Sequence, residues 1–204
     1  MPRRFSMIRS FQLADWITVA NACCGMGALF SAMEFLRSPS ARWHLLLACA
    51  LIPLALVFDI LDGKVARRRH QASPLGRELD SLADVISFGV APAAIAFAVG
   101  MQGVWDCAVL ILFVGCGVSR LARYNVTAEK LAGDDGKVSH YEGAPIPTSM
   151  VLVALLAAAA WQGRLGEQLW SGEVLVGPWL LHPLVLLFAV SGSLMISTIR
   201  IPKP

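Results

Sequence analysis

The chain has 204 residues, of which 56% are hydrophobic and 15% are charged, and its formal net charge is +3. A soluble domain of this length carries about 25% charged residues. The composition therefore excludes an ordinary soluble protein and predicts an integral membrane protein, and the length allows one domain.

A basic segment, residues 1–12, comes first, with Arg3, Arg4 and Arg9 between apolar side chains. This pattern is compatible with a short amphipathic helix that lies on the membrane surface, and equally with a frayed tail. The remainder, residues 13–204, is predicted to form one transmembrane domain.

Six long apolar runs follow, and each is interpreted as a membrane-crossing helix, which needs about 20 residues. No alternation typical of a transmembrane barrel is present, so the predicted fold class is an all-α bundle of six transmembrane helices. Gly25 and Ala28 in the first run are small and allow another helix to approach closely. The predicted spans are residues 13–36, 44–67, 79–99, 104–123, 145–161 and 178–199.

Lysine and arginine are distributed unequally between the two sides that alternating spans define. Only Arg37, Arg42 and Arg164, out of 17 basic residues, fall on one side. Because cytoplasmic loops carry the excess of Lys and Arg, both chain ends and the connection between spans two and three are predicted to face the cytoplasm. The expected location is the inner membrane of a prokaryotic cell, as a multi-pass protein.

Four aspartates lie where the second span ends and the third begins. Asp59 and Asp62 are three residues apart and Asp80 and Asp84 are four apart, and on a helix both spacings place two side chains on one face. If these faces pack together, four carboxylates converge and repel one another, which protonation or bound cations would relieve. Two Mg²⁺ or Mn²⁺ ions, which prefer carboxylate oxygens, would neutralise the cluster and bind a phosphate-bearing substrate.

Small residues and an arginine accompany the aspartates. Gly63, Ala66 and Gly76 lie close to them in sequence, and a glycine inside a helix costs about 1 kcal/mol relative to alanine. Close approach of a helix or a ligand would offset that cost. Arg67 lies eight positions after Asp59, on nearly the same face, where its planar guanidinium suits a phosphate. The alternative, charges that merely mark a turn at the water surface, does not account for the matched faces.

The pattern D-x-x-D-G-x-x-A-R-x8-G-x3-D-x3-D resembles the signature of the CDP-alcohol phosphatidyltransferase family, and every spacing agrees. The resemblance implies a six-helix homodimeric membrane enzyme, with a two-metal site open to the cytoplasm. The family moves a phosphatidyl group from a CDP-linked lipid to an alcohol and releases CMP. Carried over by position, the metal ligands would be Asp59, Asp62, Asp80 and Asp84, of which Asp84 would also be the catalytic base. The CDP moiety would lie along Asp62, Gly63, Ala66, Arg67 and Gly76.

The shared signature binds the donor, so other stretches must identify the acceptor. "ITVANACCGMGA" (17–28), "SRLARYNV" (119–126) and "YEGAPIPTS" (141–149) are similar to the phosphatidylserine synthase branch, although Ala144 stands where leucine is common. The branch implies CDP-diacylglycerol as donor and L-serine as acceptor. Arg120 or Arg123 would then pair with the serine carboxylate, and Asn125 would hydrogen-bond another polar group. Alternatively, the arginines only anchor the fourth span at the interface.

Two other functions are compatible with parts of the pattern. A sister transferase that uses glycerol 3-phosphate or inositol phosphate would share the signature, and the acceptor phosphate would suit the same arginines. A cation or proton transporter would also carry intramembrane carboxylates, but the acids here cluster at one end of the spans. The expected partners are CDP-diacylglycerol, L-serine, membrane lipids and a second copy of the chain, and no nucleic acid.

Overall fold

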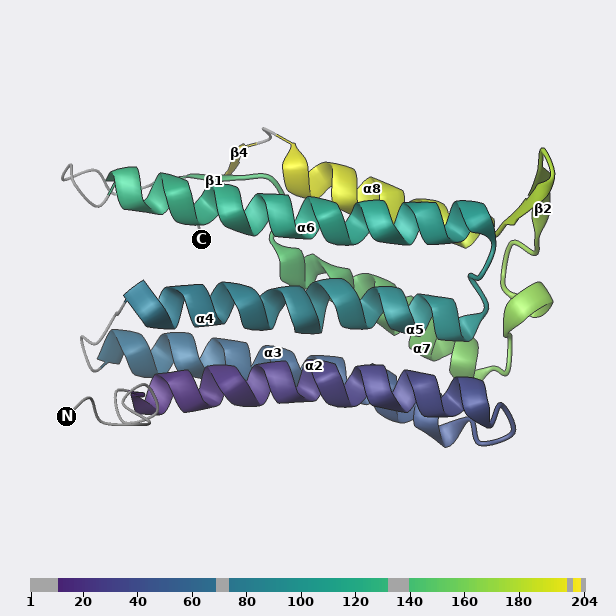
Figure 1. Cartoon of the computed structure of the whole chain (residues 1–204), viewed down its shortest axis with the longest axis horizontal. Coiled ribbons are helices and arrows are strands. Elements are labelled where there is room, and N and C mark those ends of the chain that lie inside the picture. The colour runs from purple at the N-terminus through teal and green to yellow at the C-terminus, as the bar shows by residue number, and fades with distance from the viewer. Residues whose placement is uncertain (1–10, 69–73, 132–139, 198–199, 203–204) are drawn as a thin grey trace, which may run out of the picture.

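The computed structural model describes residues 11–68, 74–131, 140–197 and 200–202. The predicted interfacial segment, residues 1–12, lies outside this part of the chain except for its last two residues. The described chain is a bundle of long helices that run roughly parallel or antiparallel to one another (Figure 1).

Four helical stretches within the described residues are long and apolar enough to cross a membrane, which is the pattern of a multi-pass membrane protein. They confirm the first four predicted spans, although the third and fourth are longer than expected. The stretches are α2 (Leu13–Arg37), α3 (Trp43–Arg68), the continuous run of α4 (Pro74–Asp84), η1 (Val85–Val90) and α5 (Ala91–Val99), and α6 (Val104–Leu131).

Two shorter apolar helices complete the bundle. The first, Ile146–Trp161, joins the 3₁₀ turn η2 (Ile146–Ser149) to α7 (Met150–Trp161), and the second, Pro183–Ile196, joins η4 (Pro183–Val185) to α8 (Leu186–Ile196). Both are shorter than the roughly 20 residues that a span requires. The six-span count therefore stays a prediction.

The prediction of a helix from residue 178 onward is wrong. Strands β2 (Val174–Val176) and β3 (Trp179–Leu181) form an antiparallel hairpin there. Gly177, in the turn between them, has a φ of 67°, and glycine at the first turn position is a preference of two-residue hairpins. Apolar content alone did not distinguish this short hairpin from the start of a helix.

A second pair of strands makes the fold mostly helical rather than all-α. Strand β1 (His140–Glu142) follows α6, and β4 (Arg200–Pro202) follows α8. The two strands pair antiparallel, with Tyr141 opposite Ile201. This pairing joins the segment after α6 to the end of the described chain (Figure 1).

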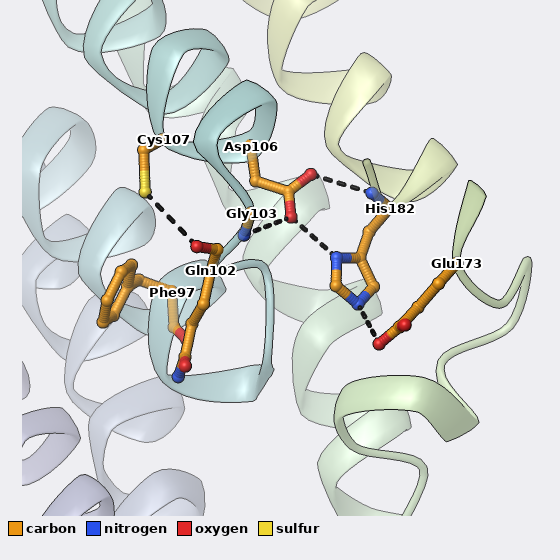
Figure 2. A network of polar contacts seen from close by, with 7 residues as sticks. All are labelled: Phe97, Gln102, Gly103, Asp106, Cys107, Glu173 and His182. Carbon is orange, nitrogen blue, oxygen red and sulfur yellow. Dashed lines mark hydrogen bonds and ion pairs between the residues drawn. The ribbon is translucent and has the colours of Figure 1, made fainter. Parts of the chain in front are cut away.

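A buried aspartate–histidine pair holds the β2–β3 hairpin on the bundle (Figure 2). Asp106, in the first turn of α6, is fully buried and accepts hydrogen bonds from the backbone N–H groups of Gly103 (3.0 Å) and His182 (2.8 Å). Its Oδ2 atom also lies 2.6 Å from Nδ1 of His182. On the other side of the ring, Nε2 lies 3.3 Å from Oε1 of Glu173, the residue before β2. His182, which lies inside the sixth predicted span, therefore fixes the end of the hairpin to the first turn of α6.

We expect Asp106→Ala to destabilise the protein by about 3–5 kcal/mol, the cost of removing one partner of a buried pair. The substitution leaves His182 and two backbone N–H groups without their acceptor. Thermal unfolding in detergent, followed by tryptophan fluorescence, would measure the change. Glu173→Ala is the matched control and should cost at most about 1 kcal/mol, because the Glu173 side chain is partly exposed. Equal losses in the two variants would contradict the central role of Asp106.

Helix α2 packs along α3 and also along α4, η1 and α5. The contact with η1 is close because Gly25 has no side chain. A Cβ atom at Gly25 would lie 2.5 Å from Oγ and 2.8 Å from Cα of Ser87. The predicted close approach at Gly25 is thus confirmed, and its neighbour is the π-helical segment that directly follows Asp84.

Candidate active site

Three aspartates from two helices meet at the end of the bundle where α3 ends and α4 begins. Asp59 and Asp62 project from the last turns of α3, and Asp80 projects from α4. Each offers one carboxylate oxygen, and these oxygens all lie within 4.8 Å of one another, so the group has the spacing to hold a metal ion. The expected convergence of the two helix faces is therefore present for these three residues.

Asp84 lies one turn after Asp80, where α4 passes into η1, and its side chain is buried. The charges of Asp59, Asp62 and Asp80 all act on its carboxylate, and so does that of Arg120. A π-helical segment such as η1 is rare and often marks a functional site. Asp84 thus extends the three-aspartate cluster toward the middle of the bundle.

The surroundings of the carboxylate oxygens are compatible with a bound cation. Oδ1 of Asp80 and Oδ1 of Asp84 are buried and have no hydrogen-bond partner among the described residues. Unpaired buried carboxylate oxygens are costly. Hard divalent cations prefer oxygen ligands such as carboxylates, and a bound cation would satisfy both oxygens.

Helix α2 supplies a residue that sequence reasoning missed. Thr18 is buried and donates from Oγ1 to Oδ2 of Asp62 at 2.5 Å. Asp15, one turn earlier, is also buried, and its charge acts on Asp62. Asp15, Thr18 and Asn21 recur every three residues in an otherwise apolar run. That polar stripe was the available signal, because residues three apart share a helix face.

The residues expected along CDP lie on the outer part of the same helix ends. Arg67 is exposed, and Ala66 and Gly76 are half-buried. Among the described residues, a Cβ atom at Gly63 would meet only the tip of the Arg67 guanidinium, at 3.8 Å. No contact within the described part of the chain therefore requires glycine here, which leaves room for a ligand at this face.

The three acceptor candidates on α6 differ in their surroundings. Arg120 is buried and acts electrostatically on Asp84. Arg123 donates from Nη2 to the backbone carbonyl of Ser197, at 3.3 Å. The structure therefore brings Arg120 to the aspartates and directs Arg123 toward the end of α8.

The side-chain amide of Asn125 has partners on α4. Its Nδ2 atom donates to both carboxylate oxygens of Glu78, at 3.3 Å each, and lies 3.0 Å from Oγ of Ser81. These contacts tie α6 to the helix that carries Asp80. They are enough to explain a polar residue at this position without a ligand.

Comparison with known proteins identifies relatives over nearly the whole chain. The family model for CDP-alcohol phosphatidyltransferase matches residues 11–192. The chain is 43% identical over 204 residues to the CDP-diacylglycerol–serine O-phosphatidyltransferase of Saccharomyces cerevisiae, covering 98% of this chain and 74% of that protein. Proteins of the same name are 36% identical over 187 residues in Mycobacterium tuberculosis (88% of this chain, 59% of that protein) and 31% identical over 199 residues in Methanocaldococcus jannaschii (98% and 78%).

Proposed function

The chain belongs to the CDP-alcohol phosphatidyltransferase family, and on this basis we propose that it transfers the phosphatidyl group of CDP-diacylglycerol to the hydroxyl of L-serine, giving phosphatidylserine and CMP. The observation that carries the proposal is the convergence of Asp59, Asp62 and Asp80 beside Asp84. The names of the yeast, mycobacterial and archaeal relatives support serine as the acceptor.

We assign the binding of two divalent cations, Mg²⁺ or Mn²⁺, to the four aspartates Asp59, Asp62, Asp80 and Asp84. Bound there, the cations would polarise the phosphate oxygens of the donor and stabilise the charge of the leaving group. The assignment is supported by the all-carboxylate donor set and by the two buried oxygens that have no other partner among the described residues.

The chemistry then follows from the positions of the protein groups. Asp84 accepts the proton of the serine hydroxyl as a general base. The serine oxygen forms a bond to the phosphorus on the lipid side of the diphosphate, and the bond from that phosphorus to the CMP oxygen breaks. Arg67, at the open face, stabilises the negative charge that CMP carries away. Gly63, Ala66 and Gly76 leave room for the nucleotide along the helix ends.

The aspartate cluster lies at one end of the long helices, which suits a donor whose acyl chains stay in lipid while its nucleotide stays in water. The excess of Lys and Arg on this side favours a site that faces the cytoplasm. The relatives come from a yeast, a bacterium and an archaeon, so they do not single out one kind of cell. The inner membrane of a prokaryote and the homodimer both stay predictions.

We propose that Arg120 recognises the acceptor, and that Arg123 and Asn125 support it by holding α6 against α8 and α4. Arg120 is buried beside Asp84, so a serine whose hydroxyl lies at Asp84 would place its carboxylate within reach of the guanidinium. A hydrogen bond to a charged group contributes about 1.5–3 kcal/mol.

Arg120→Gln should therefore raise the KM for serine by about 10- to 150-fold, while the KM for CDP-diacylglycerol changes by less than about threefold. Initial rates of CMP release at varied serine and varied donor would separate the two constants. Arg123→Gln is the comparison, and its effect should be smaller because its guanidinium contacts the Ser197 carbonyl. A larger rise of the serine KM in Arg123→Gln would move carboxylate recognition to Arg123.

An acceptor panel tests the proposed function directly. The purified protein in detergent would receive CDP-diacylglycerol with serine, glycerol 3-phosphate or inositol phosphate, and CMP release and the lipid product would be measured. We expect product only with serine. Product with a phosphate-bearing acceptor would assign the chain to a sister activity. No CMP with any acceptor, together with cation flux in liposomes, would favour a transporter.

A further inference from the structure

Asn21 is a buried polar residue that the mechanism above does not use. Its side chain is completely buried in α2, and neither Nδ2 nor Oδ1 has a hydrogen-bond partner among the described residues. An unsatisfied buried polar group costs about 1–3 kcal/mol, and native proteins keep few of them. We therefore expect the Asn21 amide to form a hydrogen bond in another state of the enzyme.

Two contacts place Asn21 between the two halves of the aspartate cluster. Thr18, one turn earlier on α2, donates to Asp62 of α3. The backbone carbonyl of Asn21 accepts a hydrogen bond from Oγ of Ser87, at 3.0 Å. Ser87 is three residues after Asp84, which is about one helical turn or 5 Å along the axis. Asn21 therefore lies on the α2 face that adjoins Asp84.

The contact between α2 and η1 at this point is held tightly. Gly25, the next residue along the same face, approaches Ser87 so closely that a side chain would not fit. The helix widens into its π-helical turn immediately after Asp84. The segment that directly follows Asp84 is thus packed against α2, and Asn21 lies at this contact.

We propose that Asn21 is a positioning residue for Asp84, and that in the metal-loaded enzyme its Nδ2 donates a hydrogen bond to one lone pair of Oδ1 of Asp84, which leaves the other lone pair for a cation. Oδ1 is the carboxylate oxygen that has no other partner among the described residues. Asn21 has no exposed surface, so it acts through Asp84 rather than on the substrate. The bond would fix the carboxylate in the orientation that accepts the serine proton. The proposal rests on the function assigned above, because Asp84 is the base of that reaction.

The test is Asn21→Leu, which keeps the size of the side chain and removes the amide. Loss of a group that orients a ligand or base typically costs about 10- to 100-fold, and we expect kcat to fall by that factor. The KM for serine should stay within about threefold of wild type. The melting temperature without metal should be unchanged or higher, since replacing an unsatisfied amide by an apolar group is neutral or stabilising. The rise of the melting temperature on adding Mn²⁺ should be smaller.

Two further variants separate positioning from packing. Asn21→Asp has the same size and retains oxygen atoms but loses the N–H donors, so its kcat should fall at least as far. Cys49→Ala is the control for packing, because Cys49 is also buried in the bundle and lies outside the residues assigned to the site. Its kcat and its Mn²⁺-induced shift should stay close to those of wild type.

Each other outcome would overturn the proposal. If Asn21→Leu kept a kcat near that of wild type, Asn21 would have no role in positioning Asp84. If the KM for serine rose while kcat stayed unchanged, Asn21 would contact the acceptor directly. A lower melting temperature that accounts for the lost activity in both Asn21 variants would mean a packing role. If the wild type itself released no CMP with serine, the proposed function would fail, whereas the Mn²⁺-induced shifts would still report on the Asn21–Asp84 coupling.

Discussion

Asp84→Asn is expected to lower kcat by about 10²- to 10⁴-fold, the usual contribution of a general base. The amide has the same shape as the carboxylate but cannot accept the serine proton, and it is a poor ligand for a divalent cation. The side chain is buried where α4 meets η1, so a neutral replacement should not unfold the protein. Single-turnover CMP release with saturating serine and CDP-diacylglycerol would measure the loss of the chemical step.

Asp15→Asn is the matched control for this result. Asp15 is also a buried acid beside the cluster, but its Oδ2 accepts the backbone N–H of Gln12 at the start of α2. An asparagine oxygen can accept the same bond, so kcat should fall by less than about tenfold. Near-normal turnover of Asp84→Asn, or an equal loss in Asp15→Asn, would place the base on another residue.

Removal of divalent metal should abolish turnover altogether. With EDTA the four aspartates would lose the charges that balance them, and the diphosphate of the donor would meet a cluster of carboxylates rather than of cations. CMP release should fall to the rate without enzyme, and excess Mg²⁺ or Mn²⁺ should restore it. Asp80→Ala should show little restoration at any metal concentration, because it deletes one of the three oxygens that lie within 4.8 Å of one another.

A readout without substrate makes the metal result independent of activity. Mn²⁺ should raise the melting temperature of the wild type in detergent, since a ligand that binds only the folded state stabilises it. The same titration of Asp80→Ala should give a much smaller rise. Full activity in EDTA, or equal Mn²⁺-induced shifts in the two proteins, would rule out the aspartates as metal ligands.

The position of the acidic residues along the helices distinguishes a transferase from a transporter. A transporter needs ionisable groups near the middle of the membrane and a path to the far side. Here Asp59, Asp62 and Asp80 meet where α3 ends and α4 begins. At the opposite end of the bundle, Asp106 and His182 are paired with each other and hold a hairpin, which accounts for these buried polar side chains without a transport path.

Local spacing in the sequence determined the parts of this protein that depend on one helix at a time. Apolar runs located the first four spans because a helix in lipid must satisfy its own backbone and present apolar side chains. The three- and four-residue spacings of the aspartates predicted their shared faces for the same reason, since each spacing is about one helical turn. The donor signature could therefore be read without a structure.

Only the tertiary structure decided which faces meet. The bond from Thr18 to Asp62 joins residues 44 apart, that from Ser87 to Asn21 joins residues 66 apart, and Asp106 and His182 are 76 apart. Periodicity gives the direction of a side chain around its own helix, but the partner depends on how the helices pack. The β2–β3 hairpin was not predicted for a related reason. Its short apolar run is compatible with a strand as well as with a helix, and contacts with neighbouring elements determine which of the two forms.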